Sequence, residues 1–130
     1  MNFCNMNILG IDFGKKRIGL AWMQMGLDVV LPFGIIEHKN AVAEIVRLCE
    51  AEKIGKIICG LPLGLDGKEN ANTVAVRDFV AQLKNSSVCP VEFIDERFSS
   101  AAADRISGDA SRDEKAAMII LQIYLDRANS

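Results

Sequence analysis

The spacing of apolar residues changes near residue 40, and this change restricts the folds that the chain can adopt. Before it, short apolar segments separated by turn residues predict three strands, over residues 8–13, 17–22 and about 29–36. Such short connections join antiparallel strands, because a parallel pair needs a crossover of a dozen or more residues. The first part of the chain is therefore expected to form an antiparallel meander.

Beyond residue 40, helices and strands alternate. Apolar side chains spaced i, i+3, i+4, i+7 predict two helices, one through Val42, Ile45, Val46 and Cys49 and one through Val76, Phe79, Val80 and Leu83. Strands follow them over residues 57–60 and 91–94. Ser99 or Ser100 is expected to cap a short helix that runs through Ile106. A break at 108–110 precedes a final helix, which Ser111 and Glu114 are expected to cap.

This order predicts an α/β fold with a five-stranded mixed sheet, in which three antiparallel strands are followed by strands that helices separate. Helices are expected on both faces of the sheet, because parallel connections cover it from water. With 130 residues the chain has the size of an ordinary domain. We therefore expect residues 1–130 to form one domain.

Composition narrows the possible functions. No uninterrupted apolar run reaches the roughly 20 residues that span a bilayer, and the N-terminus lacks the basic region of a secretory signal, which together favour the cytoplasm and no membrane. Four scattered cysteines without a C-x-x-C pair predict reduced thiols. A net charge of −2 argues against a large nucleic-acid footprint, although local basic residues suffice beside bound metal ions.

Asp12 ends the most apolar strand, on the same face as Ile8 and Gly10. An ionised carboxylate there costs free energy unless it is paired or bound to a metal ion. The alternative is an aspartate that ends the strand and accepts hydrogen bonds from turn amides, as Asp beside Gly often does. The residue alone does not distinguish a metal ligand from a turn aspartate.

Asp113 lies in the first turn of the final helix and on its apolar face. Ala116, Ala117, Ile120 and Tyr124 follow it at +3, +4, +7 and +11, so its side chain is expected to face the sheet. A carboxylate in the first turn also interacts favourably with the helix dipole. The dipole explains the position of Asp113 along the helix axis but not the face on which it lies.

A third acidic position follows the last strand, where Asp95, Glu96 and Arg97 are consecutive. Neighbouring strand residues point to opposite faces, so only one of the two carboxylates can share a pocket with Asp12, and Arg97 can pair with either. A solvated charge cluster is the alternative interpretation. If the three acidic positions meet, their oxygen atoms would suit Mg²⁺ or Mn²⁺.

Basic residues follow Asp12 directly. Lys15, Lys16 and Arg17 are candidates for contacts with phosphates, although a basic β-turn is more often simply solvated. No other catalytic arrangement stands out, because the single histidine, His38, has no evident nucleophile as partner and no Walker loop is present.

Four sequence blocks resemble the YqgF family of pre-16S rRNA nucleases, also described as Holliday-junction-resolvase-like proteins. The blocks are GIDFG at 10–14 with RIGLA at 17–21, GLPL at 60–63 with Gly67, DER at 95–97, and DEKAA at 113–117 with ILQIYL at 120–125. D-x-G after a strand also occurs in actin-like phosphotransferases, which need two domains to enclose a nucleotide. The four blocks in this order span nearly the whole chain and are specific to the family.

The resemblance implies a ribonuclease-H-like fold and a nuclease that uses Mg²⁺ or Mn²⁺ to mature the 5′ end of 16S rRNA. It implies catalytic metal ligands at Asp12, Glu96 and Asp113, while Asp95 stays open as a further ligand. We expect nucleic-acid contacts from a set of polar residues, namely Lys15, Lys16, Arg17, Arg97, Ser99 and Ser100. Residues 98–100 differ from the Thr-rich stretch of the family, and the segment with Gly60, Pro62 and Gly67 is expected to face the substrate.

Two other functions stay open on the sequence. One is a Holliday-junction-resolvase-like endonuclease, whose partner is branched DNA instead of structured or precursor rRNA. The other is a catalytically silent module that binds RNA or a ribosome-assembly partner, which the acidic charge balance favours. In each case we expect a monomer or a weak dimer.

Overall fold

The computed structural model describes residues 6–24, 26–86, 89–97, 100–106 and 108–129. The helices and strands follow the predicted order, with one 3₁₀ turn added before the first α-helix. In chain order they are β1 (Asn7–Phe13), β2 (Arg17–Gln24), β3 (Leu31–Glu37), η2 (His38–Asn40), α1 (Ala41–Ala51), β4 (Ile54–Leu61), α2 (Ala71–Asn85), β5 (Val91–Asp95), α3 (Ser100–Ala103) and α4 (Arg112–Ala128).

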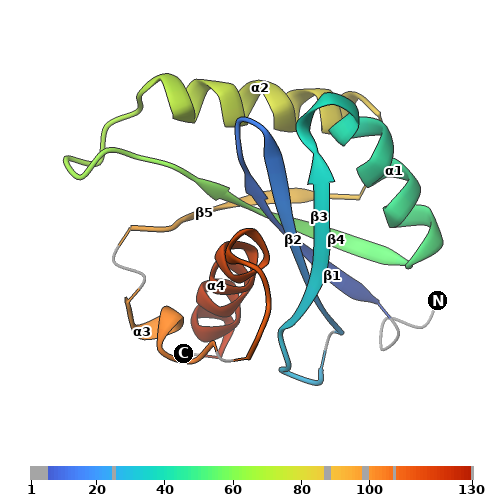
Figure 1. Cartoon of the computed structure of the whole chain (residues 1–130), viewed down its shortest axis with the longest axis vertical. Helices are drawn as coiled ribbons and strands as arrows, with labels where there is room; N and C mark the ends of the chain where they lie inside the picture. The colour runs from blue at the N-terminus through green and yellow to red at the C-terminus, as the bar shows by residue number, and fades with distance from the viewer. Residues whose placement is uncertain (1–5, 25, 87–88, 98–99, 107, 130) are drawn as a thin grey trace.

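The described strands form one five-stranded sheet in the order β3-β2-β1-β4-β5 (Figure 1). β1 pairs with β2, and β2 with β3, in antiparallel fashion, whereas β1–β4 and β4–β5 are parallel pairs. The predicted mixed sheet is therefore confirmed. Because β1, β4 and β5 run in the same direction, their C-terminal ends lie along one edge of the sheet.

Helices cover both faces of the sheet. α1 and α2 lie over one face and α4 over the other (Figure 1). Leu9 and Ile11 of β1 are buried in the cluster with α1 and α2, while Ile8 of the same strand is buried against Ile120 and Leu121 of α4. Alternation along β1 therefore decides which layer each of its side chains meets.

Some element boundaries differ from the predicted ones. β4 begins at Ile54 instead of residue 57, because Lys56 continues the strand despite its charge. Its Nζ atom lies 2.9 Å from Oε1 of Glu92 and donates a hydrogen bond to the Tyr124 hydroxyl at 3.0 Å, which compensates for its partial burial. β3 begins at Leu31 instead of about 29, and α3 ends at Ala103, before the predicted limit at residue 106.

Two further predictions, on reduced cysteines and on the absence of a membrane span, can be compared with the described residues. Among the described residues, Cys59 is a buried free thiol and Cys49 and Cys89 are half-buried free thiols, while Cys4 lies outside the described part. No helix in the described ranges combines the length and the apolar character needed to cross a bilayer.

Candidate active site

Asp12 and Glu96 lie on the face of the sheet that α4 covers. In β1, Asp12 has the same parity as Ile8, which packs against α4. In the chain that leaves β5, Glu96 comes two residues after Ile94, which packs against the same helix. Both carboxylates therefore stand at the C-terminal ends of parallel strands, on one side of the sheet.

The strand between them, β4, leaves space for a carboxylate. Gly60 pairs with Ile94 of β5, and the residue before it, Cys59, pairs with Ile11 of β1. A Cβ atom at Gly60 would lie 2.5 Å from Oε2 of Glu96. The Glu96 carboxylate therefore occupies the space that a side chain at residue 60 would fill, next to the end of β1 where Asp12 lies.

The two carboxylates are held in an unfavourable electrostatic environment. Burial, and then the charge of Asp113, raises the pKa of Asp12. Burial, and then the charges of Asp12 and Asp95, raises the pKa of Glu96 to about 7. Burial, and then the charges of Asp12 and Glu96, also raises the pKa of Cys59, whose side chain is buried on the α1 and α2 side of β4. Partial desolvation and mutual repulsion thus both disfavour the ionised pair.

Asp113 reaches this region from the N-terminus of α4. Ser111 and Glu114 form the predicted capping box, in which each side chain bonds to the backbone amide of the other residue. A side chain at Gly19 of β2 would overlap the backbone carbonyl of Asp113, so the helix start rests directly on the strand. Oδ2 of Asp113 lies 3.1 Å from Nε of Arg17, the first residue of β2.

Asp95 and Arg97 form a separate pair. Nη2 of Arg97 lies 2.7 Å from Oδ2 of Asp95, and Nε of Arg97 donates to both carboxylate oxygens at 3.0 and 3.1 Å. Hydrogen bonds from Arg97 lower the pKa of Asp95. In β5 Asp95 shares its parity with Phe93, which packs on the α1 and α2 side. Register and pairing therefore make Glu96, not Asp95, the neighbour of Asp12.

The predicted ligands are neighbours but do not surround a common point. Within the described ranges, no three carboxylate, imidazole or thiol groups stand close enough together to hold one metal ion. Asp12 is coupled to both Glu96 and Asp113, while Asp113 is paired with Arg17. A metal-binding role for the three carboxylates stays a prediction.

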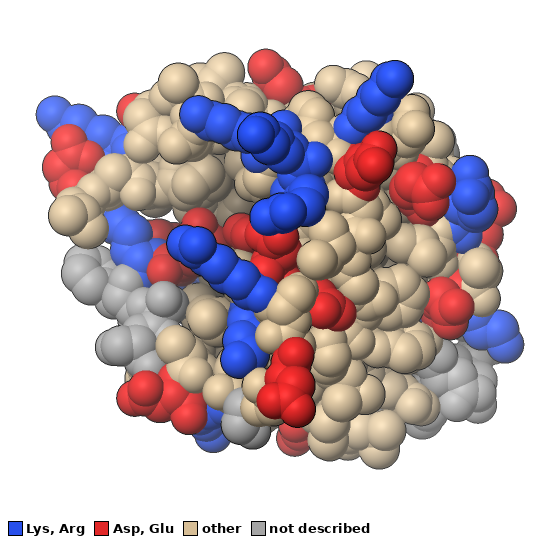
Figure 2. Space-filling view, viewed as in Figure 1, with Lys and Arg blue, Asp and Glu red and all other residues tan. Residues whose placement is uncertain are grey.

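Basic side chains lie beside the acidic ones. Lys15, Lys16 and Arg17 are exposed in and after the turn that joins β1 to β2. Figure 2 shows Lys and Arg side chains gathered over the tip of this hairpin, next to a group of acidic side chains at the start of α4. The predicted phosphate contacts are therefore placed next to the carboxylates.

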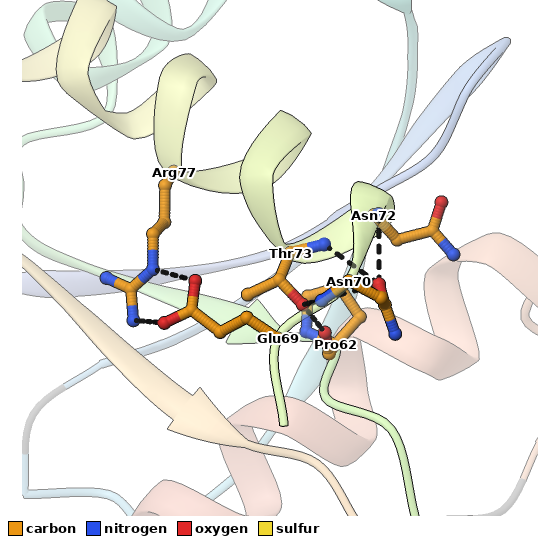
Figure 3. Close-up of polar contacts among 6 residues, drawn as sticks. All are labelled: Pro62, Glu69, Asn70, Asn72, Thr73 and Arg77. Carbon is orange, nitrogen blue, oxygen red and sulfur yellow. Dashed lines mark hydrogen bonds and ion pairs between the residues drawn. The ribbon is translucent and has the colours of Figure 1, made fainter. Parts of the chain in front are cut away.

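The segment predicted to face the substrate is divided between strand and loop. Gly60 belongs to β4, whereas Pro62 and Gly67 belong to the loop before α2. Thr73, which is buried in the first turn of α2, donates a hydrogen bond to the Pro62 carbonyl and accepts one from the Asn70 amide (Figure 3).

The neighbouring part of the loop is held by an ion pair and by the capping of α2. Asn70 accepts hydrogen bonds from the amides of Asn72 and Thr73, and Arg77 forms a two-point ion pair with Glu69 at 2.8 and 2.9 Å (Figure 3). The loop is thus fixed to α2 at its base. Of the two predicted serine contacts, Ser99 lies outside the described residues, and only the backbone of Ser100, the first residue of α3, is described.

The packing roles of two glycines were not recognised from the sequence, although Gly60 was named there as part of the substrate-facing segment. Gly19 lets α4 approach β2, and Gly60 makes room for Glu96. An isolated glycine within a strand pattern often marks such a close approach, and this was the available signal.

Comparison with known proteins agrees with this arrangement. The family model described as Holliday junction resolvase, RuvX, matches residues 6–127. A protein of Maridesulfovibrio salexigens named "Putative pre-16S rRNA nuclease" is 38% identical, over 95% of this chain and 100% of that protein. A protein of the same name from Orientia tsutsugamushi is 37% identical, over 92% of this chain and 83% of its own length.

A solved structure shows the same fold. The RuvC protein of T. thermophilus in complex with a Holliday junction substrate superposes with a TM-score of 0.66, at 13% identity, over 96% of each chain. The predicted ribonuclease-H-like fold is thereby confirmed. The match of the family model and the close relatives together show that this chain belongs to the Holliday junction resolvase family, RuvX.

Proposed function

We propose that this protein is a divalent-metal-dependent nuclease that hydrolyses phosphodiester bonds in precursor 16S rRNA. Membership of the RuvX family and the names of its relatives support this function. We further propose that it acts in the cytoplasm as a monomer or a weak dimer, and that residues 1–130 are one domain.

The observation that carries the proposal is the half-buried pair of carboxylates at the C-terminal ends of β1 and β5. Asp12 and Glu96 are each partly desolvated, and the charge of Asp12 helps to raise the pKa of Glu96 to about 7. A folded protein tolerates such repulsion poorly unless a cation offsets it. Carboxylate oxygens are the ligands that hard cations such as Mg²⁺ and Mn²⁺ prefer, so the donor set fits these ions.

In this proposal Asp12, Glu96 and Asp113 would hold the cation. Because the three carboxylates do not surround a common point, this requires Asp113 to leave its ion pair with Arg17. When bound, a divalent ion supplies a Lewis acid for a phosphate oxygen. The capping box of α4 and the contact at Gly19 fix the backbone of Asp113, while Gly60 fixes the space available to Glu96. Arg17, which is paired with Asp113 at 3.1 Å, would be free to donate hydrogen bonds to a phosphate oxygen when Asp113 serves as a ligand.

Cleavage of a labelled RNA that spans the 5′ end of mature 16S rRNA tests the proposal. We expect cleavage that requires Mg²⁺ or Mn²⁺ and that falls at least about 100-fold in Asp12→Asn, because the substitution removes a metal ligand. Asp104→Asn, an exposed change of the same kind in the segment after α3, serves as the control and should retain full activity.

The same assay separates the competing functions. A four-way DNA junction included as a second substrate tests resolvase activity, which the description of the family model favours. Preferred cleavage of the junction would replace RNA by DNA as the substrate. Equal background cleavage by wild type and Asp12→Asn on both substrates, with RNA binding retained, would identify a silent binding module.

A further inference from the structure

Three adjoining hollows surround the tip of the β1–β2 hairpin. The largest, of ≈ 710 Å³, lies between the hairpin turn and the end of β3, and Lys16 and Arg17 are part of its wall. The second, of ≈ 520 Å³, lies between α1 and α2. The third, of ≈ 240 Å³, lies where the hairpin meets Pro62 and the first turns of α2.

Shared wall residues show that these three hollows adjoin one another. His38 and Lys39 of η2 line both the first and the second hollow. Phe13 lines the second and the third, and Lys15 lines the first and the third. We call the three adjoining hollows together the hairpin groove.

The first part of the hairpin groove is basic, although the chain as a whole carries a net charge of −2. Its described wall residues include Lys15, Lys16, Arg17 and Lys39, and Glu37 is the one acidic residue among them. The three lysines are exposed, and none of them forms an ion pair with another described residue. The groove therefore attracts anions.

The basic part of the groove also leads to the candidate active site. Arg17 lines the groove and is paired with Asp113 at 3.1 Å. In Figure 2 the basic side chains over the hairpin tip border directly on the acidic group at the start of α4. An anionic polymer in the groove would thus continue toward the carboxylates.

The second part of the groove has a different lining. Phe13 packs there on the buried Phe79 with ring centroids 4.6 Å apart and ring planes tilted by 36°, and the ring of His38 meets Phe13 edge-on at 4.9 Å. Both Phe13 and His38 face this hollow, beside Gln82 and Asp78 as polar groups. Rings next to cations suit unpaired bases and their phosphates, whereas a duplex keeps its bases stacked inside.

We propose that the hairpin groove binds a single-stranded segment of nucleic acid that flanks the cleaved phosphodiester, with Lys15 and Lys39 contacting its backbone. The proposal rests on the proposed nuclease function for its position next to the scissile bond. It adds η2 and the α1–α2 hollow to the substrate-binding surface. It also predicts that the substrate has an unpaired end or loop next to the cleaved bond.

Binding without metal tests this proposal separately from catalysis. The probe is a fluorescein-labelled RNA of ten nucleotides without secondary structure, in EDTA and at several salt concentrations, followed by fluorescence anisotropy. We expect Lys39→Glu to weaken binding about tenfold and to reduce the slope of log K against log salt by about 0.7, since one phosphate contact is lost. Lys39→Arg should bind like wild type.

Lys84→Glu is the matched control, because Lys84 is an exposed lysine of α2 that is not part of the wall of the three hollows, and the substitution carries the same change of charge. It should bind the RNA within about twofold of wild type, because it contacts no phosphate in this arrangement. Circular dichroism of each variant confirms that the fold is retained.

Three outcomes would overturn the proposal. One is equal binding by wild type and Lys39→Glu. Another is an equal loss in Lys39→Glu and Lys84→Glu, which would reflect net charge alone. The third is that a blunt RNA duplex of the same length competes as well as the single strand does. If cleavage fails in the nuclease assay while Lys39→Glu still weakens binding, the binding role of the groove is supported and the nuclease function is contradicted.

Discussion

Oε2 of Glu96 lies 2.5 Å from the point that a Cβ atom at Gly60 would occupy. A methyl group at residue 60 and the Glu96 carboxylate cannot both fit there. Glu96 can take its position because Gly60 has no side chain. The position of one candidate ligand is thus controlled by a residue that has no functional group of its own.

Gly60→Ala should therefore lower the rate of metal-dependent cleavage at least about tenfold, because a ligand displaced by about 1 Å no longer has the geometry that the reaction needs. The control is Gly10→Ala, whose Cβ atom would lie 2.5 Å from Leu121 and would crowd the same layer without touching Glu96. Overpacking should destabilise both variants by about 1–3 kcal/mol in urea denaturation. Equal activity of the two variants would show that Gly60 does not position Glu96.

Stability of the metal-free protein should depend on pH through Glu96. Its pKa rises from 4.5 when unfolded to about 7 in the fold, so the folded protein binds the proton more tightly. The stabilising contribution is present below pH 4.5 and is lost as the pH rises through about 7. With allowance for solvent exposure, the loss is on the order of 1–2 kcal/mol.

Urea denaturation in EDTA at pH 5 and pH 8 measures this difference. Asp12 contributes in the same direction, because its pKa is also raised. Glu96→Gln, which cannot ionise, should show a smaller loss between the two pH values than wild type. A wild-type protein that is more stable at pH 8 than at pH 5 would contradict the raised pKa of Glu96.

The two carboxylates at the end of β5 should respond differently to loss of charge. Glu96→Gln is expected to reduce cleavage at least about 100-fold, because Glu96 faces Asp12 and is a proposed ligand. Asp95→Asn should retain cleavage within about threefold, because Asp95 faces the other layer and binds Arg97. A greater loss in Asp95→Asn would make Asp95 the ligand, and steady-state cleavage rates with Mn²⁺ decide between them.

Thr73→Val should destabilise the protein by about 1–3 kcal/mol, because the half-buried carbonyl of Pro62 would lose the donor that the buried Thr73 supplies. Thr73→Ser keeps the hydroxyl group and is the control, with a smaller loss from the missing methyl group. Thermal denaturation followed by circular dichroism gives both values. Equal stability of Thr73→Val and wild type would show that the bond to Pro62 does not hold the loop.

Much of the fold could be predicted because its elements carry local signals. The change of period near residue 40 separates the meander from the alternating part, and Ser111 with Glu114 marks the start of α4. The early start of β4 was missed, because Lys56 interrupts the apolar run. Its partners, Glu92 and Tyr124, are 36 and 68 residues away in sequence and are invisible to a local pattern.

The candidate site could be predicted only in part for a similar reason. Strand alternation showed that Asp95 and Glu96 face opposite ways, but it did not show which of them faces Asp12. That choice depends on the register of β5 against β4, where Gly60 pairs with Ile94. The hairpin groove depends on how η2 and α2 lie around the hairpin turn, and no single segment encodes this arrangement.

The contact between α4 and β2 at Gly19 has a consequence for how the protein can change. Helix and strand touch there through backbone atoms, so no side-chain adjustment is available to absorb an added methyl group. Even alanine at this position would lift the first turn of α4 and carry Asp113 away from Asp12. The distance between Asp12 and Asp113 is thus set by the backbone, and substitutions elsewhere on the helix surface should leave this distance unchanged.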